Sequence, residues 1–176
     1  MSVTTACRDI KELNPVAQKA CNLFMAECKK AGLNVLITET YRSQARQNYL
    51  YEQGRTRPGS IVTWTKNSNH TGRMAWDICK NVKGKEYSDA KFFEQCGAIA
   101  KKLGITWGGT WKTPDRPHFE VTANWKEPKA TTAVNTELEK LKKQVKTRFL
   151  FSDETIEYLS KYKFATSLFE RLAKTK

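Results

Sequence analysis

Two polar segments, far apart in the sequence, carry the only histidines of this chain. His70 precedes a stretch of alternating residues that ends at Cys79, and His118 begins another such stretch. Alternation of this kind predicts strands with one face in a core. Asp77 and Asp115 add a carboxylate to each segment. A sheet that brings the two segments together would therefore gather two histidines and two carboxylates at one place.

This combination of side chains is typical of a metal site. A catalytic zinc takes about three protein ligands, usually histidine and carboxylate, and keeps one position open for water. We predict that His70, Asp77 and His118 bind one zinc ion per chain, with Asp115 beside it as a free carboxylate. The alternative is that two ordinary histidines lie near acidic residues by chance.

The local sequence indicates how these side chains are presented. In one continuous strand His70 and Asp77 would lie on opposite faces, so we expect Gly72 to let the chain turn between them. Pro117 keeps the residue before it out of the helical region. Asp115 should therefore reach the site from a loop.

Three further roles concern proton transfer and charge. A general base must reach the attacking water without occupying a coordination position. Asp115 fits this requirement, and Glu120 is the competing base, although its spacing also suits a hydrogen-bond partner of a histidine. Arg42 is the candidate for stabilising the oxyanion that forms when water attacks an amide. The alternative for Arg42 is an ordinary solvated charge.

The order of helical and strand patterns predicts an α+β domain with a small antiparallel sheet flanked by helices. Asn14 is a candidate N-cap, followed by proline at the first helical position. The other boundaries follow from capping residues, glycines and apolar spacing. The predicted elements are a helix from 15 to about 31, a strand over 33–40, a helix capped by Ser43 to about 53, a long loop over 55–69, a strand over 74–79, a helix capped by Ser88 to about 103, and strands over 105–107 and 118–121.

Composition changes after Trp125, where the core pattern ends. We assign residues 1–126 to a main domain, 127–136 to a linker and 137–176 to a helical C-terminal module. That module contains a short amphipathic helix over 137–145 and a helix capped by Ser152. It has few large apolar positions, so its own core should be marginal. We expect it to dock on the main domain, on a second copy or on a wall ligand.

The chain has 31 basic and 18 acidic residues, a net charge of +13. This charge favours polyanionic partners, namely nucleic acid, an anionic membrane surface or a teichoic-acid-bearing wall, or it is a basic surface without a specific partner. No apolar run approaches the roughly 18 residues of a membrane span, and the N-terminus lacks the pattern of a secretory signal. The five cysteines form no C-x-x-C pair, which indicates reduced thiols and a protein made in the cytoplasm.

Several short motifs occur in one order within residues 8–125. Together they resemble the L-alanyl-D-glutamate peptidases, which belong to a zinc peptidase group with the D-alanyl-D-alanine carboxypeptidases and the dipeptidases of vancomycin resistance. The residues that carry the resemblance are Thr38, Tyr41-Arg42-Ser43, Gln53-Gly54-Arg55-Thr56, Ser68, His70, Gly72, Ala75, Asp77, Trp107-Gly108-Gly109, Asp115 and Pro117-His118-Phe119-Glu120.

The resemblance implies that residues 1–126 form a zinc peptidase domain. It implies His70, Asp77 and His118 as the zinc ligands, Asp115 as the base, and Arg42 on the carbonyl oxygen of the scissile bond. Many relatives with the D-x-x-H form are phage endolysins that cut peptidoglycan stem peptides between L-Ala and D-Glu. Aspartate at the base position favours this branch.

Our hypothesis is therefore an endolysin that stays in the host cytoplasm until release and then acts on the cell wall. Its partners would be the stem peptide and an anionic wall polymer, with no role for nucleic acid. The C-terminal module would bind the wall or mediate self-association. Two alternatives stay open: a D-Ala-D-Ala carboxypeptidase or dipeptidase with the same zinc chemistry, and a non-enzymatic wall-binding protein on this fold.

Overall fold

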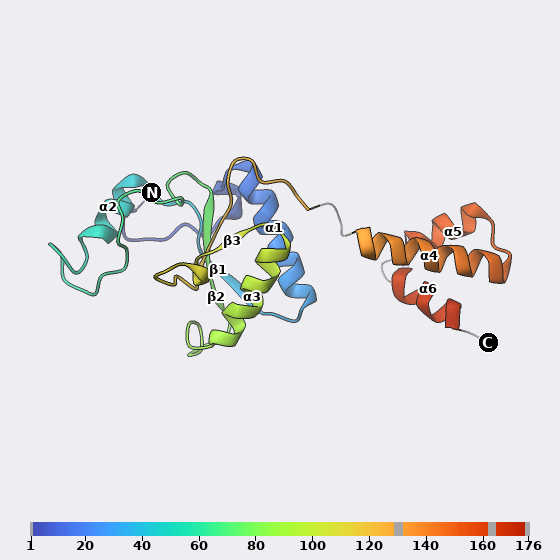
Figure 1. Cartoon of the computed structure of the whole chain (residues 1–176). Coiled ribbons are helices and arrows are strands. Elements are labelled where there is room, and N and C mark those ends of the chain that lie inside the picture. The colour runs from blue at the N-terminus through green and yellow to red at the C-terminus, as the bar shows by residue number, and fades with distance from the viewer. Residues whose placement is uncertain (1, 129–131, 162–164, 175–176) are drawn as a thin grey trace. The chain divides into compact units, whose positions relative to one another are not determined.

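The computed structural model describes residues 2–128, 132–161 and 165–174, and of residues 132–137 only the backbone. The chain divides into two compact units, Met1–Glu127 and Pro128–Lys176 (Figure 1). Within the described residues, none of the helices combines the length and the apolar character that crossing a membrane requires.

The first unit is built on a four-stranded sheet in which every pairing is antiparallel. The strand order is β1-β2-β4-β3, so the two central strands come from distant parts of the chain. This sheet and its helices confirm the predicted α+β fold. The strands are β1 (Val35–Glu39), β2 (Ala75–Lys80), β3 (Thr106–Trp107) and β4 (His118–Glu120).

Helices α1 (Pro15–Lys30) and α3 (Ala90–Lys102) lie on the same side of this sheet (Figure 1). The alternation predicted for β2 explains why: Trp76 and Ile78 are fully buried against these helices, while Asp77 between them belongs to the other face. The aromatic side chains of this core pack closely, with the ring centroids of Phe24 and Phe119 4.7 Å apart. The core thus fixes β2 and β4 side by side.

The helix starts show which caps were predicted correctly. The Asn14 side chain accepts a hydrogen bond from the backbone of Val16, as expected for the N-cap of α1. A short 3-10 helix, η1 (Ile10–Glu12), precedes it. For α3 the prediction was wrong by one residue: the cap is Asp89 rather than Ser88, because its carboxylate accepts from Phe92 N at 3.0 Å.

Helix α2 (Gln44–Glu52) and the segment after it lie on the opposite side of the sheet from α1 and α3 (Figure 1). The Ser43 hydroxyl caps α2, as predicted. The expected loop over residues 55–69 is confirmed, since this described segment contains only an isolated bridge between Gln53 and Arg57. This long loop therefore faces the same side as Asp77.

The turn just before β2 differs from the prediction. Arg73, not Gly72, adopts the left-handed conformation, with φ of 61°. A residue with a Cβ pays roughly 1–2 kcal/mol for this conformation. The Arg73 side chain offsets the cost through an ion pair with Glu12 at 2.6 Å and a stack over the Tyr41 ring at 3.8 Å. Contacts distant in sequence therefore decide which residue carries the strain.

The second unit contains α4 (Thr132–Phe149), α5 (Asp153–Ser160) and α6 (Ala165–Lys174). Ser152 caps α5 as predicted. The predicted linker over 127–136 and the short helix over 137–145 were wrong in extent, because α4 already begins at Thr132 and continues to Phe149. Adding turns to an existing helix costs far less than nucleating one, so α4 extends beyond its apolar positions. Residues 129–131 of the predicted linker lie outside the described residues.

Candidate metal centre

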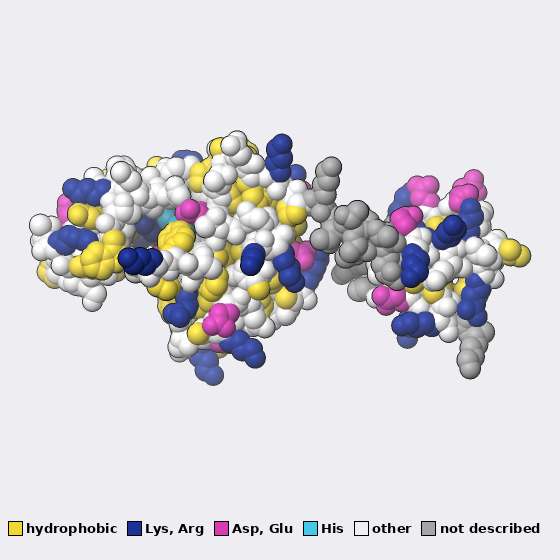
Figure 2. Space-filling view, viewed as in Figure 1, with side chains coloured by type: hydrophobic (Ala, Val, Ile, Leu, Met, Phe, Trp, Pro, Cys, Tyr) yellow, Lys and Arg dark blue, Asp and Glu magenta, His cyan; other side chains and the backbone are white. Residues whose placement is uncertain are grey.

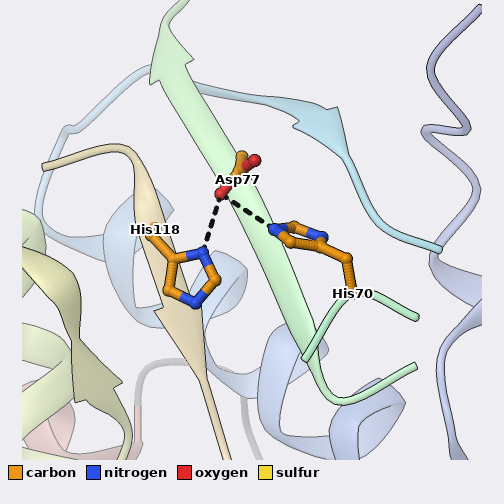
Figure 3. Close-up of side chains that lie close together, drawn as sticks. All are labelled: His70, Asp77 and His118. Atoms are coloured by element: carbon orange, nitrogen blue, oxygen red, sulfur yellow. Dashed lines mark hydrogen bonds and ion pairs between the residues drawn. The ribbon is translucent and has the colours of Figure 1, made fainter. Parts of the chain in front are cut away.

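Three side chains from different segments converge on the sheet face opposite the core (Figure 3). Asp77 on β2 and His118 on β4 are direct cross-strand partners, so the antiparallel register places them side by side. His70 comes from the loop before β2. One nitrogen or oxygen of each side chain lies within 4.8 Å of those of the other two. The structure thus brings together the three residues predicted as metal ligands.

His70 is buried, and its two ring nitrogens have different surroundings. Nδ1 lies 2.6 Å from the backbone oxygen of Thr40. A carbonyl oxygen only accepts hydrogen bonds, so Nδ1 carries the proton and Nε2 is left with a bare lone pair. That Nε2 has no hydrogen-bond partner and lies 3.2 Å from Asp77 Oδ1.

His118 is held in the complementary orientation. Its Nε2 donates to Glu120 Oε2 at 2.9 Å, and its Nδ1 lies 3.2 Å from Asp77 Oδ1. The hydrogen bond from His118 lowers the pKa of Glu120, so the carboxylate is ionised and can only accept. Asn69 donates to the same oxygen at 2.8 Å. Of the two roles considered for Glu120, this geometry matches the partner of a histidine.

With both rings neutral, two imidazole lone pairs and a carboxylate oxygen would face one another at short range. Such an arrangement repels itself unless a cation lies between the groups. Burial lowers the pKa of His118, but its hydrogen bonds to Asp77 and Glu120 outweigh this effect and raise the pKa to about 9. In the metal-free chain a proton thus supplies part of the missing positive charge. The donor set of two nitrogens and one oxygen fits a metal ion that keeps an open position.

Arg42 is fixed beside this centre by a buried network. Its guanidinium donates to Glu39 Oε2 at 2.6 Å and to Gln47 Oε1 at 2.8 Å, and lies 3.6 Å from Asp77 Oδ2. Glu39 on β1 is the cross-strand partner of Asp77, so Glu39, Asp77 and His118 form one row across three strands. Arg46 binds the other oxygen of Glu39 at 2.6 Å.

Sequence reasoning missed Glu39 and Gln47 as parts of the site. Glu39 is buried with only 6% of its surface exposed, and Gln47 is fully buried. Their signal in the sequence was weak: arginines three and seven positions after Glu39, and a glutamine on a short helix. Both side chains orient Arg42, and neither belongs to the three residues that can hold the metal.

Asp115 lines the same cleft as the three ligands but is not one of them. Its backbone nitrogen donates to Gly108 O at 3.0 Å, and its carbonyl accepts from His118 N at 3.2 Å. A Cβ on Gly108 would lie 2.6 Å from the Asp115 oxygen, so only glycine permits this approach. Burial raises the pKa of Asp115, and the charge of Asp77 adds to the effect.

The rest of the Trp-Gly-Gly segment has a packing role. A Cβ on Gly109 or on Gly97 would lie 2.2 Å from the Trp107 ring, so the indole fits between two glycines. Its Nε1 donates to the backbone oxygen of Arg116 at 2.8 Å. This contact anchors the loop that carries Asp115.

The metal centre lies at the bottom of a cleft of about 930 Å³. In Figure 2 a histidine side chain is visible inside a hollow, beside an acidic side chain, with hydrophobic and basic side chains along the rim. Residues 61–65 and 67–70 line one part of the cleft, and residues 111, 113–115 and 117–118 line another. The ring of Trp111 lies 5.1 Å from that of His118. This volume is at the upper end of the range of small-molecule sites, so the cleft accommodates an extended substrate.

Comparisons with known proteins agree with this geometry. Residues 62–121, which contain the three candidate ligands and Asp115, match a family model described as D-alanyl-D-alanine carboxypeptidase. The chain is 33% identical over 129 residues to the peptidoglycan L-alanyl-D-glutamate endopeptidase CwlK of Bacillus subtilis (strain 168), covering 64% of this chain and 75% of that protein.

A solved structure shares the fold. It is the L-Ala D-Glu endopeptidase ChiX of Serratia marcescens, with a TM-score of 0.51 and 24% sequence identity, covering 64% of this chain and 83% of that chain. The relative from Bacillus subtilis is matched over most of its length, and the family model spans the metal centre. The chain therefore belongs to the metallopeptidase family that includes the D-alanyl-D-alanine carboxypeptidases and the L-alanyl-D-glutamate peptidases.

Proposed function

We propose that the protein is a zinc endopeptidase that hydrolyses the bond between L-Ala and D-Glu in peptidoglycan stem peptides. The observation that carries this proposal is the convergence of two imidazole nitrogens and a carboxylate oxygen beside Asp115 in an open cleft. The relative in Bacillus subtilis is a peptidoglycan endopeptidase of this specificity by name. Imidazole and carboxylate ligands suit zinc, and three protein ligands are typical of its catalytic sites.

The residues of the chain have separate tasks in this reaction. When bound, zinc lowers the pKa of water toward ~7 and polarises a carbonyl group. The Thr40 carbonyl and the Glu120 carboxylate hold the two histidine rings in the tautomers that present Nε2 and Nδ1. Asp115 accepts a proton from the attacking water and gives it to the leaving amine of D-Glu as the amide C–N bond breaks.

We propose for Arg42 the role predicted from the sequence, stabilisation of the oxyanion. Its hydrogen bonds to Glu39 and Gln47 fix the plane of the guanidinium at the bottom of the cleft. The guanidinium N–H groups that make neither contact would donate to the carbonyl oxygen of the scissile bond, where negative charge develops. A rigid donor stabilises that charge without reorganising during the reaction.

The second candidate is a D-Ala-D-Ala carboxypeptidase or dipeptidase, which the description of the matching family model favours. Mass analysis of fragments from purified peptidoglycan separates the two. We expect new D-Glu amino termini with the intact chain and none with His70→Ala. Release of D-Ala alone would replace our proposal with the second candidate. No cleavage by the zinc-loaded chain would support a non-enzymatic wall-binding protein.

We further propose that the enzyme acts as an endolysin, held in the host cytoplasm until its release to the wall. All five cysteines are free thiols, four of them buried, which suits synthesis in a reducing compartment. The net charge of +13 suits attraction to an anionic wall polymer. We assign wall binding or self-association to the second unit. Expression in the cytoplasm with and without a co-expressed holin tests the first point, because only the co-expressing cells should lyse.

A further inference from the structure

Exposed hydrophobic side chains gather around the cleft. Nine large hydrophobic residues are exposed in the described residues, and five of them line this cleft, namely Ile61, Val62, Trp64, Tyr87 and Trp111. Trp64 is the most exposed of these five, at 74%. An indole left this open to water beside a catalytic centre is a candidate for ligand contact.

Trp64 is held in place by a stack of side chains. The Arg55 guanidinium lies 3.9 Å from the centre of the Tyr51 ring and 5.6 Å from that of Trp64. Its N–H groups donate to the backbone oxygens of Tyr51 and Thr63. Arg55 therefore ties the loop together beside the indole, and both of its terminal nitrogens already donate to backbone oxygens.

The residues on either side of Trp64 are also tied to the catalytic centre. The side-chain amide of Gln47 donates to Thr65 O at 2.6 Å and to Thr63 Oγ1 at 3.2 Å. The carbonyl oxygen of the same side chain accepts from Arg42. Because Gln47 is fully buried, it fixes the loop relative to Arg42. The chain on both sides of Trp64 is thus fixed, and the exposed indole extends from an anchored loop into the cleft.

We propose that Trp64 is the platform of a saccharide subsite that binds the N-acetylmuramoyl sugar attached to L-Ala. This inference rests on the proposed function. In peptidoglycan the L-Ala nitrogen is acylated by the lactyl group of that sugar, so the sugar ring is one residue away from the scissile bond. An extended residue spans about 3.3–3.6 Å, so a bond held at the metal centre places the sugar within the same cleft.

The chemistry of the platform matches a sugar better than an anionic polymer. A pyranose ring has a flat face of C–H groups that packs on an aromatic plane, and an open indole offers the largest such plane. A phosphodiester would instead need a cation that presents its donors to the ligand, and the terminal nitrogens of Arg55, the cation beside the indole, donate to backbone oxygens. Trp111 is the other indole of the cleft, but its position against His118 places it at the reacting bond.

The test compares two substrates: a stem tetrapeptide with a free L-Ala amine, and the same peptide carrying N-acetylmuramic acid. Stacking on an aromatic plane predicts that the intact chain cleaves the second with a kcat/KM about tenfold higher. Trp64→Ala should remove this preference, so that the two substrates are cleaved with similar kcat/KM. Trp64→Phe should retain most of it, because a smaller aromatic plane remains.

Tyr158→Ala is the matched control, since it removes an aromatic side chain that is 77% exposed in the second unit. It should leave both rates unchanged. Zinc content and the thermal midpoint of Trp64→Ala should equal those of the intact chain. An equal loss on both substrates, or no loss on either, would overturn the subsite.

A binding measurement separates failure of the subsite from failure of the proposed function. Calorimetry with N-acetylmuramoyl-L-Ala-D-Glu on the Asp115→Asn chain reads the subsite without cleavage. Adding Trp64→Ala should weaken that binding about tenfold. If this loss is seen while the intact chain makes no D-Glu amino termini, the subsite stands and the proposed bond specificity fails. Equal binding with and without Trp64 rejects the subsite.

Discussion

The first unit buries both apolar and polar side chains, whereas the buried residues in the described part of the second unit are all apolar. The buried polar or charged residues of the first unit belong to the metal centre and its surroundings: Glu39, Thr40, Arg42, Gln47, His70 and His118. Its main core contains sixteen buried residues, against five in the second unit.

This difference has a physical basis. Burying a charged or polar group costs free energy even when it is paired, so a site of this kind needs a large apolar core to offset the cost. The first unit has such a core beneath β2 and β4. The second unit has only enough apolar surface to hold three helices together. We therefore expect catalysis to depend on the first unit, and the second to act through its surface.

Replacing a proposed zinc ligand in the first unit should have the largest effect of the changes considered. His70→Ala or His118→Ala leaves two ligands and opens a hole in a buried polar site, so most of the zinc should be lost on elemental analysis. Asp153→Asn, in the second unit, is the control and should retain it. Full zinc occupancy in both histidine variants would show that the metal binds elsewhere.

The next largest effect should come from Asp115→Asn. The fold and the zinc content should persist, because Asp115 is not part of the ligating group. Turnover should fall by about 10²–10⁴, the usual contribution of general acid–base catalysis. The matched variant is Glu120→Gln, which loses the charged partner of His118 and should weaken zinc binding by about 10–100-fold. Near-normal turnover in Asp115→Asn would show that Glu120 is the base or that no side chain acts as one.

The sequence predicted the parts of the molecule that local patterns control. The alternation of Trp76, Asp77 and Ile78 places one face of β2 in the core and the carboxylate on the other. The scarcity of histidine leaves few ways to build a metal site. Together with the order of helical and strand patterns along the chain, these features predicted the α+β fold and the three residues that the structure brings together.

The missed features depend on contacts between distant segments. Glu39 joins the centre because the register of β1 on β2 pairs it with Asp77, and no local pattern specifies a register. Arg73 takes the strained turn position because Glu12 and Tyr41 hold its side chain. A sequence pattern shows neither contact, since both arise from tertiary packing.

Glu39→Gln tests whether this unexpected residue acts through Arg42. The variant loses the carboxylate that holds the guanidinium at 2.6 Å, so Arg42 should shift toward Asp77 Oδ2, now 3.6 Å away. An arginine that competes for Asp77 should lower zinc affinity by about tenfold, the lower end of the effect of such supporting residues.

The double variant with Arg42→Gln is the control for Glu39→Gln. If Glu39 acts through Arg42, changing Glu39 should have little further effect on zinc affinity once Arg42 is gone. Additive losses, measured by competition with a chelator, would show that Glu39 acts by its own charge.

The smallest effect on cleavage of a soluble peptide should appear when the second unit is removed. Truncation after Asn135 leaves the first unit intact, so cleavage of a soluble stem peptide should be unchanged.

Residues 137–176 carry ten basic and six acidic residues, a net +4 of the total +13, so most of the attraction to an anionic wall also remains. Salt should therefore weaken wall binding of both forms alike. We nevertheless expect the truncated form to lose activity on intact walls or to change its oligomeric state in solution, because Leu159 and Leu168, which line a cavity of the second unit, and the core residue Ile156 are removed. Phe169→Ala in the full chain is the matched control: it opens the small core without changing charge, and should give the same loss. Unchanged lysis and unchanged mass in both variants would leave the second unit without a role in wall recognition.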